Sequence, residues 1–275
     1  MEVLLFGAAL AVAWWLYRSW QRWRRRRIAR RPLPADWRSI LERNVPLYSG
    51  LPDALREELH GHIQLFLHDK TFRGFQGLEV TEEMRLTVAG NACLLLLNRP
   101  HSEFSGFSSI YLYPDTFVSR QRSYDGLVES IGEHARLGES WHRGPVVLSW
   151  DAARSGSRDI RDGHNLVLHE FAHKLDGADG VVDGAPILSH RSQHLSWARV
   201  MRREYEQLRR QAGAGLERLI NHYGATAPQE FFAVVVETFY ERPAQLKRHH
   251  PQLYAELEKC FRVDPLAWHA AIDAD

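Results

Sequence analysis

Two histidines and a glutamate lie close together in the stretch His169-Glu170-Phe171-Ala172-His173. If this stretch is helical, histidines four positions apart project one above the other, so two imidazole nitrogens can reach one metal ion. A glutamate beside such an ion can take a proton from a water molecule that the metal activates. The pattern therefore predicts hydrolysis at a zinc site, with His169 and His173 as ligands and Glu170 as general base.

The flanking residues predict the helix that this chemistry needs. Apolar residues at 168, 171, 172 and 175 have the spacing of one buried helical face. Asp162 is placed to cap the start of the helix, and Gly177 is placed to end it. Motifs of this length also occur by chance, and the alternative is a helix whose two histidines and glutamate merely face solvent or fill a polar pocket.

A hydrolytic zinc site needs a third protein ligand and one open position. The segment 226–237 predicts a second, strongly apolar helix, with Thr226 and Gln229 as a capping pair. Glu230 and Glu237 lie on one stripe of this helix, seven residues apart. A carboxylate in a buried helix is costly unless it is paired. We therefore predict that Glu230 binds the metal and that Glu237 accepts a hydrogen bond from a histidine N–H.

Other candidate ligands suit the site less well. Asp176 lies three residues beyond His173, and three ligands within a turn and a half of one helix would be crowded. It is better placed to orient a histidine ring. His190 and His194 form a second pair four residues apart, but Arg191 stands where the motif has its glutamate. A cation there opposes metal binding, so a surface position is favoured.

These residues carry a resemblance to a known family. The stretch 169–176, followed by 223–226 (Tyr-Gly-Ala-Thr) and 230–233 (Glu-Phe-Phe-Ala), resembles the Mlc titration factor A family of zinc metallopeptidases. It is more distantly similar to the catalytic domain of anthrax lethal factor. The likeness extends over residues 35–270 and includes the segment 144–151.

The resemblance implies the ligands and the activity. In that family the metal is held by the two motif histidines and by a glutamate seven residues after a tyrosine, which implies one zinc ion on His169, His173 and Glu230. It also implies a peptidase acting on a peptide or protein, with Glu170 as general base. Tyr223 would then donate a hydrogen bond to the developing oxyanion, and core packing is its alternative role.

A second function, of a different class, stays open. The family is named for sequestering a transcriptional repressor of sugar uptake, so the resemblance also implies a repressor as partner. In that case the protein regulates sugar uptake by binding, and hydrolysis is weak or incidental. A purely structural zinc site is disfavoured, because Glu170 would then have no role beside three ligands.

Composition and periodicity predict a single globular domain over residues 32–275. A chain of 275 residues with 44% hydrophobic content can bury a full core. We expect an α+β fold, mainly helical and zincin-like, with a small sheet built from strands near 71–80, 109–113 and 144–150. The strand at 144–150 is our candidate for pairing with an extended substrate backbone, and an ordinary core strand is the alternative.

Residues 1–31 form a distinct unit. An uncharged apolar run from 3 to 17 is followed by eight arginines, with Trp20 and Trp23 between them. A cleaved signal peptide carries its positive charge before the apolar run, so we predict instead a hydrophobic helix that anchors the chain to a membrane through residues 3–20. The run would span about 22 Å as a helix, which is short of the ~30 Å hydrocarbon core. A helix lying on the membrane, or one packed on the domain, is the alternative.

The charges of the two units differ in sign. Eight arginines and one glutamate lie in residues 1–31, which leaves 27 basic and 33 acidic residues in the rest of the chain. A nucleic-acid-binding fold needs a basic face on its globular part, so we expect no direct nucleic-acid partner. The arginines predict a domain on the cytoplasmic side of the inner membrane with the N-terminus outside. A purely cytoplasmic protein is the alternative.

Overall fold

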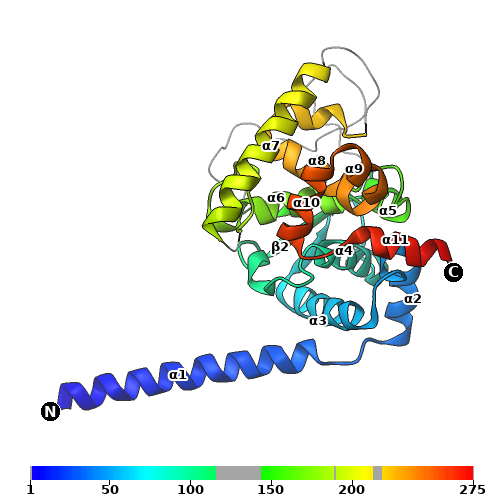
Figure 1. Ribbon diagram of the computed structural model, residues 1–275. Coiled ribbons are helices and arrows are strands. Elements are labelled where there is room, and N and C mark those ends of the chain that lie inside the picture. The colour runs from blue at the N-terminus through cyan, green and yellow to red at the C-terminus, as the bar shows by residue number, and fades with distance from the viewer. Residues whose placement is uncertain (1, 116–143, 189, 213–218, 275) are drawn as a thin grey trace.

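The computed structural model describes residues 2–115, 144–188, 190–212 and 219–274. Within these ranges the chain is mainly helical and contains one three-stranded parallel sheet, which confirms the predicted α+β class (Figure 1).

The sheet lies early in the chain. Its strands are β1 (Thr71–Gly74), β2 (Ser109–Tyr113) and β3 (Val146–Ser149), in the order β1-β2-β3 and all parallel. Ile110 of β2 is in register with Val146 of β3. All three predicted strands are present, although the first and the third are shorter than predicted. Among the described residues, β3 pairs with β2 alone and forms an edge of the sheet.

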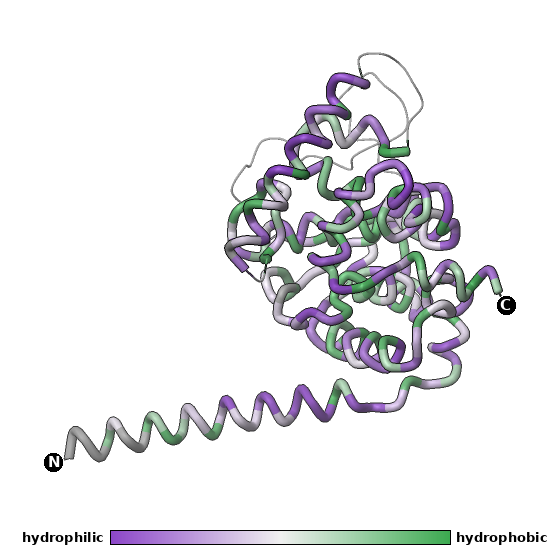
Figure 2. Tube along the Cα trace, in the orientation of Figure 1, coloured by the Kyte–Doolittle hydropathy of each residue, from purple (hydrophilic) through white to green (hydrophobic). Residues whose placement is uncertain are grey.

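Four helices contribute a large part of the core: α3 (Asp53–Asp69), α4 (Glu82–Leu94), α6 (Leu166–Asp176) and α8 (Pro228–Glu241). Every residue of α8 from Phe231 onward is buried. Figure 2 shows that hydrophobic stretches of the chain, in green, lie inside the body of the molecule. A helix that is buried on all sides is central to the fold, and α8 packs directly on α6.

Six further helices and four 3-10 turns are described. They are α2 (Ala35–Asn44), α5 (Trp150–Arg158), α7 (Arg191–Ala212), α9 (Pro243–His249), α10 (Pro251–Phe261) and α11 (Pro265–Ala274), with single 3-10 turns η1 (Pro46–Tyr48), η2 (His101–Phe104), η3 (Gly177–Asp179) and η4 (His222–Ala225). Prolines begin α8, α9 and α10, because proline presets the helical φ and a first-turn N–H has no partner to lose. Cys93 and Cys260 are both buried, and no disulfide joins them.

The N-terminal helix α1 (Glu2–Ala29) extends away from the body as a single rod (Figure 1). Its last turns are docked on α3: Ile28 is buried, and Arg25 donates two hydrogen bonds to Asp69, at 3.1 and 2.8 Å. The helix is present as predicted. The membrane-spanning part of the prediction is not supported, since no described helix combines enough length and apolar character to cross a bilayer.

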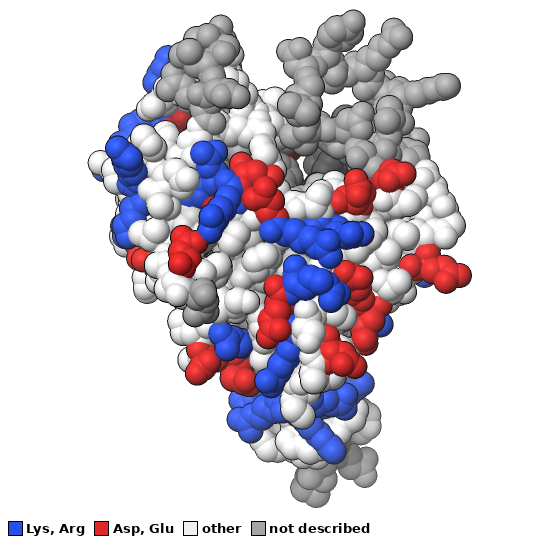
Figure 3. Space-filling view, turned by 90° about the vertical axis from the view of Figure 1, so that its right-hand side faces the viewer, with Lys and Arg blue, Asp and Glu red and all other residues white. Residues whose placement is uncertain are grey.

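Charge on the molecule is mixed in sign. Figure 3 shows acidic and basic side chains intermingled over one face, with basic ones gathered at its lower end, the level at which Figure 1 places α1. This agrees with the arginine-rich second half of α1.

Candidate metal centre

Helix α6 carries the His-Glu-x-x-His motif, as predicted, but begins three residues later. Asn165 is its N-cap, and the Asn165 side chain accepts a hydrogen bond from the Leu168 N–H at 3.0 Å. The predicted cap, Asp162, instead accepts from the His164 N–H in the preceding turn. Asn165 caps the helix through a side-chain oxygen, as predicted for Asp162, but it lies closer to the first buried residue of the helix. Gly177 ends the helix as predicted, and its N–H donates to the His173 carbonyl.

Helix α8 carries Glu230 in its first turn. Pro228 opens the helix, but the N-cap is Ala227, which makes no side-chain cap. The predicted capping pair is wrong, because the Thr226 hydroxyl donates to the Tyr223 carbonyl at 2.7 Å and so stabilises η4 instead.

The packing of α6 on α8 brings three potential ligands together. The Nε2 atoms of His169 and His173 lie 3.2 Å apart, and Oε2 of Glu230 lies 3.2 Å from the first and 3.4 Å from the second. Tetrahedral zinc with bonds of about 2.0–2.1 Å places neighbouring donors ~3.3 Å apart. The three atoms therefore have the spacing that one such ion requires. His173 and Glu230 are only partly buried, which leaves one side of the triangle accessible.

The electrostatics of the triangle favour a cation. Burial opposes charge on His169, but the nearby carboxylates of Glu237 and Glu230 raise its pKa well above the ordinary value. Burial also acts to raise the pKa of Glu230, and the hydrogen bonds from His169 and His173 overcome this and lower it strongly. The carboxylates thus favour positive charge at the point where Nε2 of His169 meets Glu230, which is where a metal ion would be bound.

Behind the triangle, Glu237 holds His169 in place. Its Oε1 accepts from Nδ1 of His169 at 2.7 Å, and its Oε2 accepts from the Asn165 N–H at 2.7 Å. Such a bond fixes the tautomer and leaves Nε2 free to bind a metal. The structure confirms the predicted pairing of Glu237 with a histidine N–H.

The two predicted catalytic residues are carried by α6 and η4. Glu170 is half-buried on α6, between the two histidines in sequence. The ring of Tyr223, on η4, lies 6.0 Å from that of His169, centroid to centroid. Asn221 caps η4 by accepting from the Tyr223 N–H at 2.9 Å, and this fixes the backbone of the tyrosine. The Tyr223 ring therefore lies beside one member of the triangle, and the Glu170 charge is near enough to His169 to act on its pKa.

Asp176 does not orient a histidine, so that prediction is wrong. Its carboxylate is fully buried and accepts hydrogen bonds from the N–H groups of Asp183, Gly184 and Ala185. The histidine-orienting role belongs to Glu237, which reaches His169 from the neighbouring helix.

One buried acid escaped the sequence analysis. Glu241 is 1% exposed, and its two carboxyl oxygens have no hydrogen-bond partner among the described residues. Burial, and next the charge of Glu237, raise the pKa of Glu241 well above its ordinary value. The signal was present in the sequence, because Glu241 follows Glu237 by four positions on the stripe that begins at Glu230.

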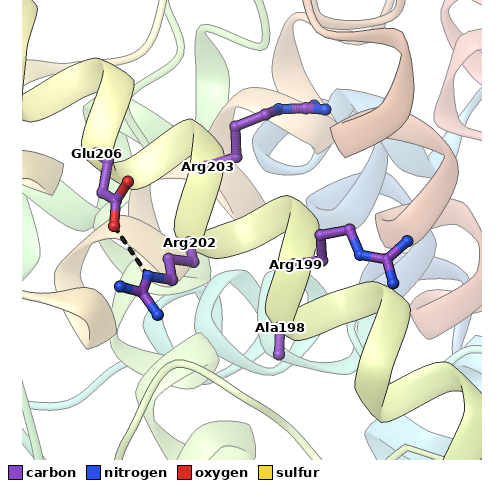
Figure 4. A pocket seen from close by; sticks show the side chains of 5 residues that line it. All are labelled: Ala198, Arg199, Arg202, Arg203 and Glu206. Carbon is purple, nitrogen blue, oxygen red and sulfur yellow. Dashed lines mark hydrogen bonds and ion pairs between the residues drawn. The ribbon is translucent and has the colours of Figure 1, made fainter.

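A separate, shallow pocket of about 400 Å³ lies on α7 and contains none of these groups. It is lined by Ala198, Arg199, Arg202, Arg203 and Glu206 (Figure 4). Arg202 and Glu206, one turn apart on α7, form an ion pair at 2.8 Å, which neutralises part of the pocket's charge.

Two histidines and a glutamate on packed helices, with a further glutamate beside them, define a site of metallopeptidase type. The comparison with known families agrees, since the model of the glucose-regulated metallo-peptidase M90 family matches residues 20–262. The chain belongs to this family, and a metallopeptidase requires a metal ion.

Individual relatives cover most of the chain. An uncharacterised protein of Synechocystis is 41% identical over 254 residues, which is 92% of each chain. The Mlc titration factor A of Pectobacterium atrosepticum is 32% identical and covers 84% of this chain and 87% of its own. That of Serratia proteamaculans is 33% identical, with 85% and 88% covered. These relatives confirm the resemblance to Mlc titration factor A.

Proposed function

We propose that this protein is a zinc-dependent peptidase whose metal is held by His169, His173 and Glu230. The observation that carries the proposal is the triangle of donor atoms, 3.2–3.4 Å on each side, in which two neutral nitrogens and one carboxylate oxygen suit zinc. Three protein ligands leave one position for water or substrate, which is the arrangement of catalytic rather than structural zinc.

When bound, the zinc ion supplies Lewis acidity, which polarises the substrate carbonyl and lowers the pKa of a water molecule toward about 7. Glu170 accepts the proton of the attacking water and passes it to the leaving nitrogen, which completes hydrolysis of the amide. Tyr223 donates a hydrogen bond to the negative charge that develops on the carbonyl oxygen as water attacks. Glu237 keeps the proton of His169 on Nδ1, so that Nε2 stays available.

The edge strand β3 is the proposed support for the substrate backbone. It packs against α6, and the Lys174 ammonium donates to the Gly144 carbonyl at 2.9 Å, just before the strand begins. An extended peptide added to this edge would be bound through backbone hydrogen bonds, largely independent of its sequence.

Peptide cleavage tests the proposal. Full-length wild type and Glu170→Gln are incubated with a mixed peptide library, and zinc content is measured in both. We expect cleavage by wild type alone, with zinc in both proteins, because glutamine keeps the shape of glutamate but cannot accept the proton. Equal cleavage by both proteins would exclude Glu170 as the base.

A second candidate function is regulation by binding a transcriptional repressor. It is supported by the name of two relatives, Mlc titration factor A. A binding role predicts that Glu170→Gln retains full function in cells, whereas the peptidase role predicts loss. Repressor capture by both wild type and Glu170→Gln, with no cleavage by either, would favour binding.

We further propose that α1 holds the domain at the cytoplasmic side of the inner membrane. Trp14 and Trp15 are 62% and 59% exposed, and Arg18 stacks over Trp14 at 5.1 Å. Exposed tryptophans beside arginines suit an anionic lipid interface. Full-length protein should co-sediment with phosphatidylglycerol vesicles, and Trp14→Glu with Trp15→Glu should weaken this. Equal recovery of wild type and variant would contradict the proposal.

A further inference from the structure

A buried carboxylate at the end of α6 fixes the loop that follows. Oδ1 of Asp176 accepts from the N–H groups of Asp183 at 3.3 Å, Gly184 at 2.9 Å and Ala185 at 2.9 Å, and Oδ2 accepts from Gly184 at 3.0 Å. Three consecutive amides thus converge on one side chain that is fully buried. A charged group hydrogen-bonded in this way holds its partners more strongly than a neutral one.

The same loop is pressed against the start of α8. Gly184 has φ +81°, and a Cβ atom placed there would lie 2.7 Å from the Pro228 carbonyl oxygen. The Gly184 carbonyl in turn accepts from the Trp197 indole N–H at 3.2 Å. Trp197 is buried and packs edge-on against Phe232 of α8, with ring centroids 5.9 Å apart. The loop is therefore enclosed by the end of α6, by α7 and by the first turn of α8.

These contacts connect α6 to α8 close to the residues that would bind the metal. Asp176 is three residues after His173, and Pro228 is two residues before Glu230. At the other end of α6, Glu237 binds both His169 and the Asn165 N–H. Helix α6 is thus tied to α8 at both ends, and the donor triangle lies between the two ties.

We infer that Asp176 is a positioning residue for the metal site: through residues 183–185 it sets where the first turn of α8, and hence Glu230, stands relative to His169 and His173. The inference rests on the proposed metal site. It assigns Asp176 no contact with metal or substrate. A ligand displaced by 1 Å no longer satisfies the bond length that zinc requires, so a loosened loop weakens the site without removing any ligand.

The test uses full-length Asp176→Asn. Asparagine keeps one acceptor oxygen but turns an N–H donor toward the Gly184 amide, where Oδ2 of the aspartate had accepted. Gly184→Ala perturbs the same loop independently, through its positive φ and the contact with Pro228. The matched control is Asp179→Asn, an exposed aspartate of the same loop that accepts one bond, from the Val181 N–H at 3.0 Å.

Two measurements separate positioning from general stability. Zinc affinity is measured by competition with a chelator, and the visible absorption of the Co²⁺-loaded protein reports ligand geometry, both at a temperature where circular dichroism shows every variant folded. We expect Asp176→Asn and Gly184→Ala to bind zinc at least about 10-fold more weakly and to change the Co²⁺ spectrum, as changes behind metal ligands do. Asp179→Asn should match wild type.

Unchanged affinity and spectrum in folded Asp176→Asn and Gly184→Ala would overturn the inference, even if both melt at lower temperature. A wild type that binds neither Zn²⁺ nor Co²⁺ would refute the proposed metal site and the inference with it. Normal metal binding by wild type and by both loop variants would refute only the positioning role.

Discussion

Glu237 Oε1 lies 2.7 Å from Nδ1 of His169, while Glu230 Oε2 lies 3.2 Å from Nε2 of the same ring. The two nitrogens of one imidazole therefore face two carboxylates of one helix, seven residues apart. Glu237 fixes the orientation of the His169 ring, and Glu230 faces the nitrogen of that ring that would bind the metal. Because both carboxylates come from α8, this helix contributes as much to the site as α6, which carries the two histidines.

Replacing Glu237 should weaken the metal site without removing a ligand. In Glu237→Gln the histidine loses a charged acceptor, and its Nε2 becomes a poorer and less well-oriented donor. We expect zinc affinity to fall by about 10- to 100-fold. Chelator competition measures this, with Glu42→Gln at an exposed glutamate of α2 as the control. Wild-type affinity in Glu237→Gln would show that His169 needs no support from α8.

Removing Glu230 should abolish the stabilisation that metal gives. A ligand present at about 1,000 times its Kd stabilises the native state by ~4 kcal/mol, so a chelator should lower the melting temperature of wild type. Glu230→Ala should melt at the same temperature with or without chelator. Glu170→Gln, which keeps all three ligands, should respond to the chelator as wild type does. A chelator response in Glu230→Ala would point to a different third ligand.

Tyr223→Phe should slow the chemical step while leaving zinc content intact. Loss of one oxyanion donor typically lowers kcat by about 10²- to 10³-fold, and KM should change little because the bond strengthens only in the transition state. Tyr205→Phe is the matched control, since the Tyr205 hydroxyl bonds the Ala225 carbonyl of the same η4 turn. Equal kcat in wild type and Tyr223→Phe would show that Tyr223 serves in core packing and not in catalysis.

The buried acid Glu241 should make stability depend on pH. Burial and the Glu237 charge raise its pKa above 4.5, so the folded chain keeps a proton that the unfolded chain loses. A raised acid pKa contributes stability that is complete below about 4.5 and is lost as the pH rises toward the folded value. Glutamine at this position carries no such penalty.

Glu241→Gln should therefore gain stability relative to wild type as the pH rises from 4.5 toward neutrality. Urea unfolding at several pH values, with chelator present to remove metal effects, measures the difference. Glu42→Gln again controls for the charge change alone. A difference between Glu241→Gln and wild type that stays constant across this range would contradict the prediction.

Local spacing was enough to predict the parts of the site that lie within one helix. The His169 and His173 pair follows from the helical repeat, because residues four apart face the same way in any α-helix. The buried stripe of α8 likewise identified Glu230 and Glu237 as acids that need partners. The strand at 109–113 and the breaker Gly177 were equally local and were confirmed.

Tertiary structure alone decided which groups meet. Glu230 and Glu237 reach His169 across 61 and 68 residues of chain, and only the packing of α8 along α6 sets those distances. Asp176, which spacing assigned to a histidine, binds residues 183–185 because the chain folds back there. Asn165 rather than Asp162 caps α6, and Thr226 serves η4 rather than α8. Periodicity fixes the direction of a side chain, but its partner depends on how separate elements pack, which no local pattern records.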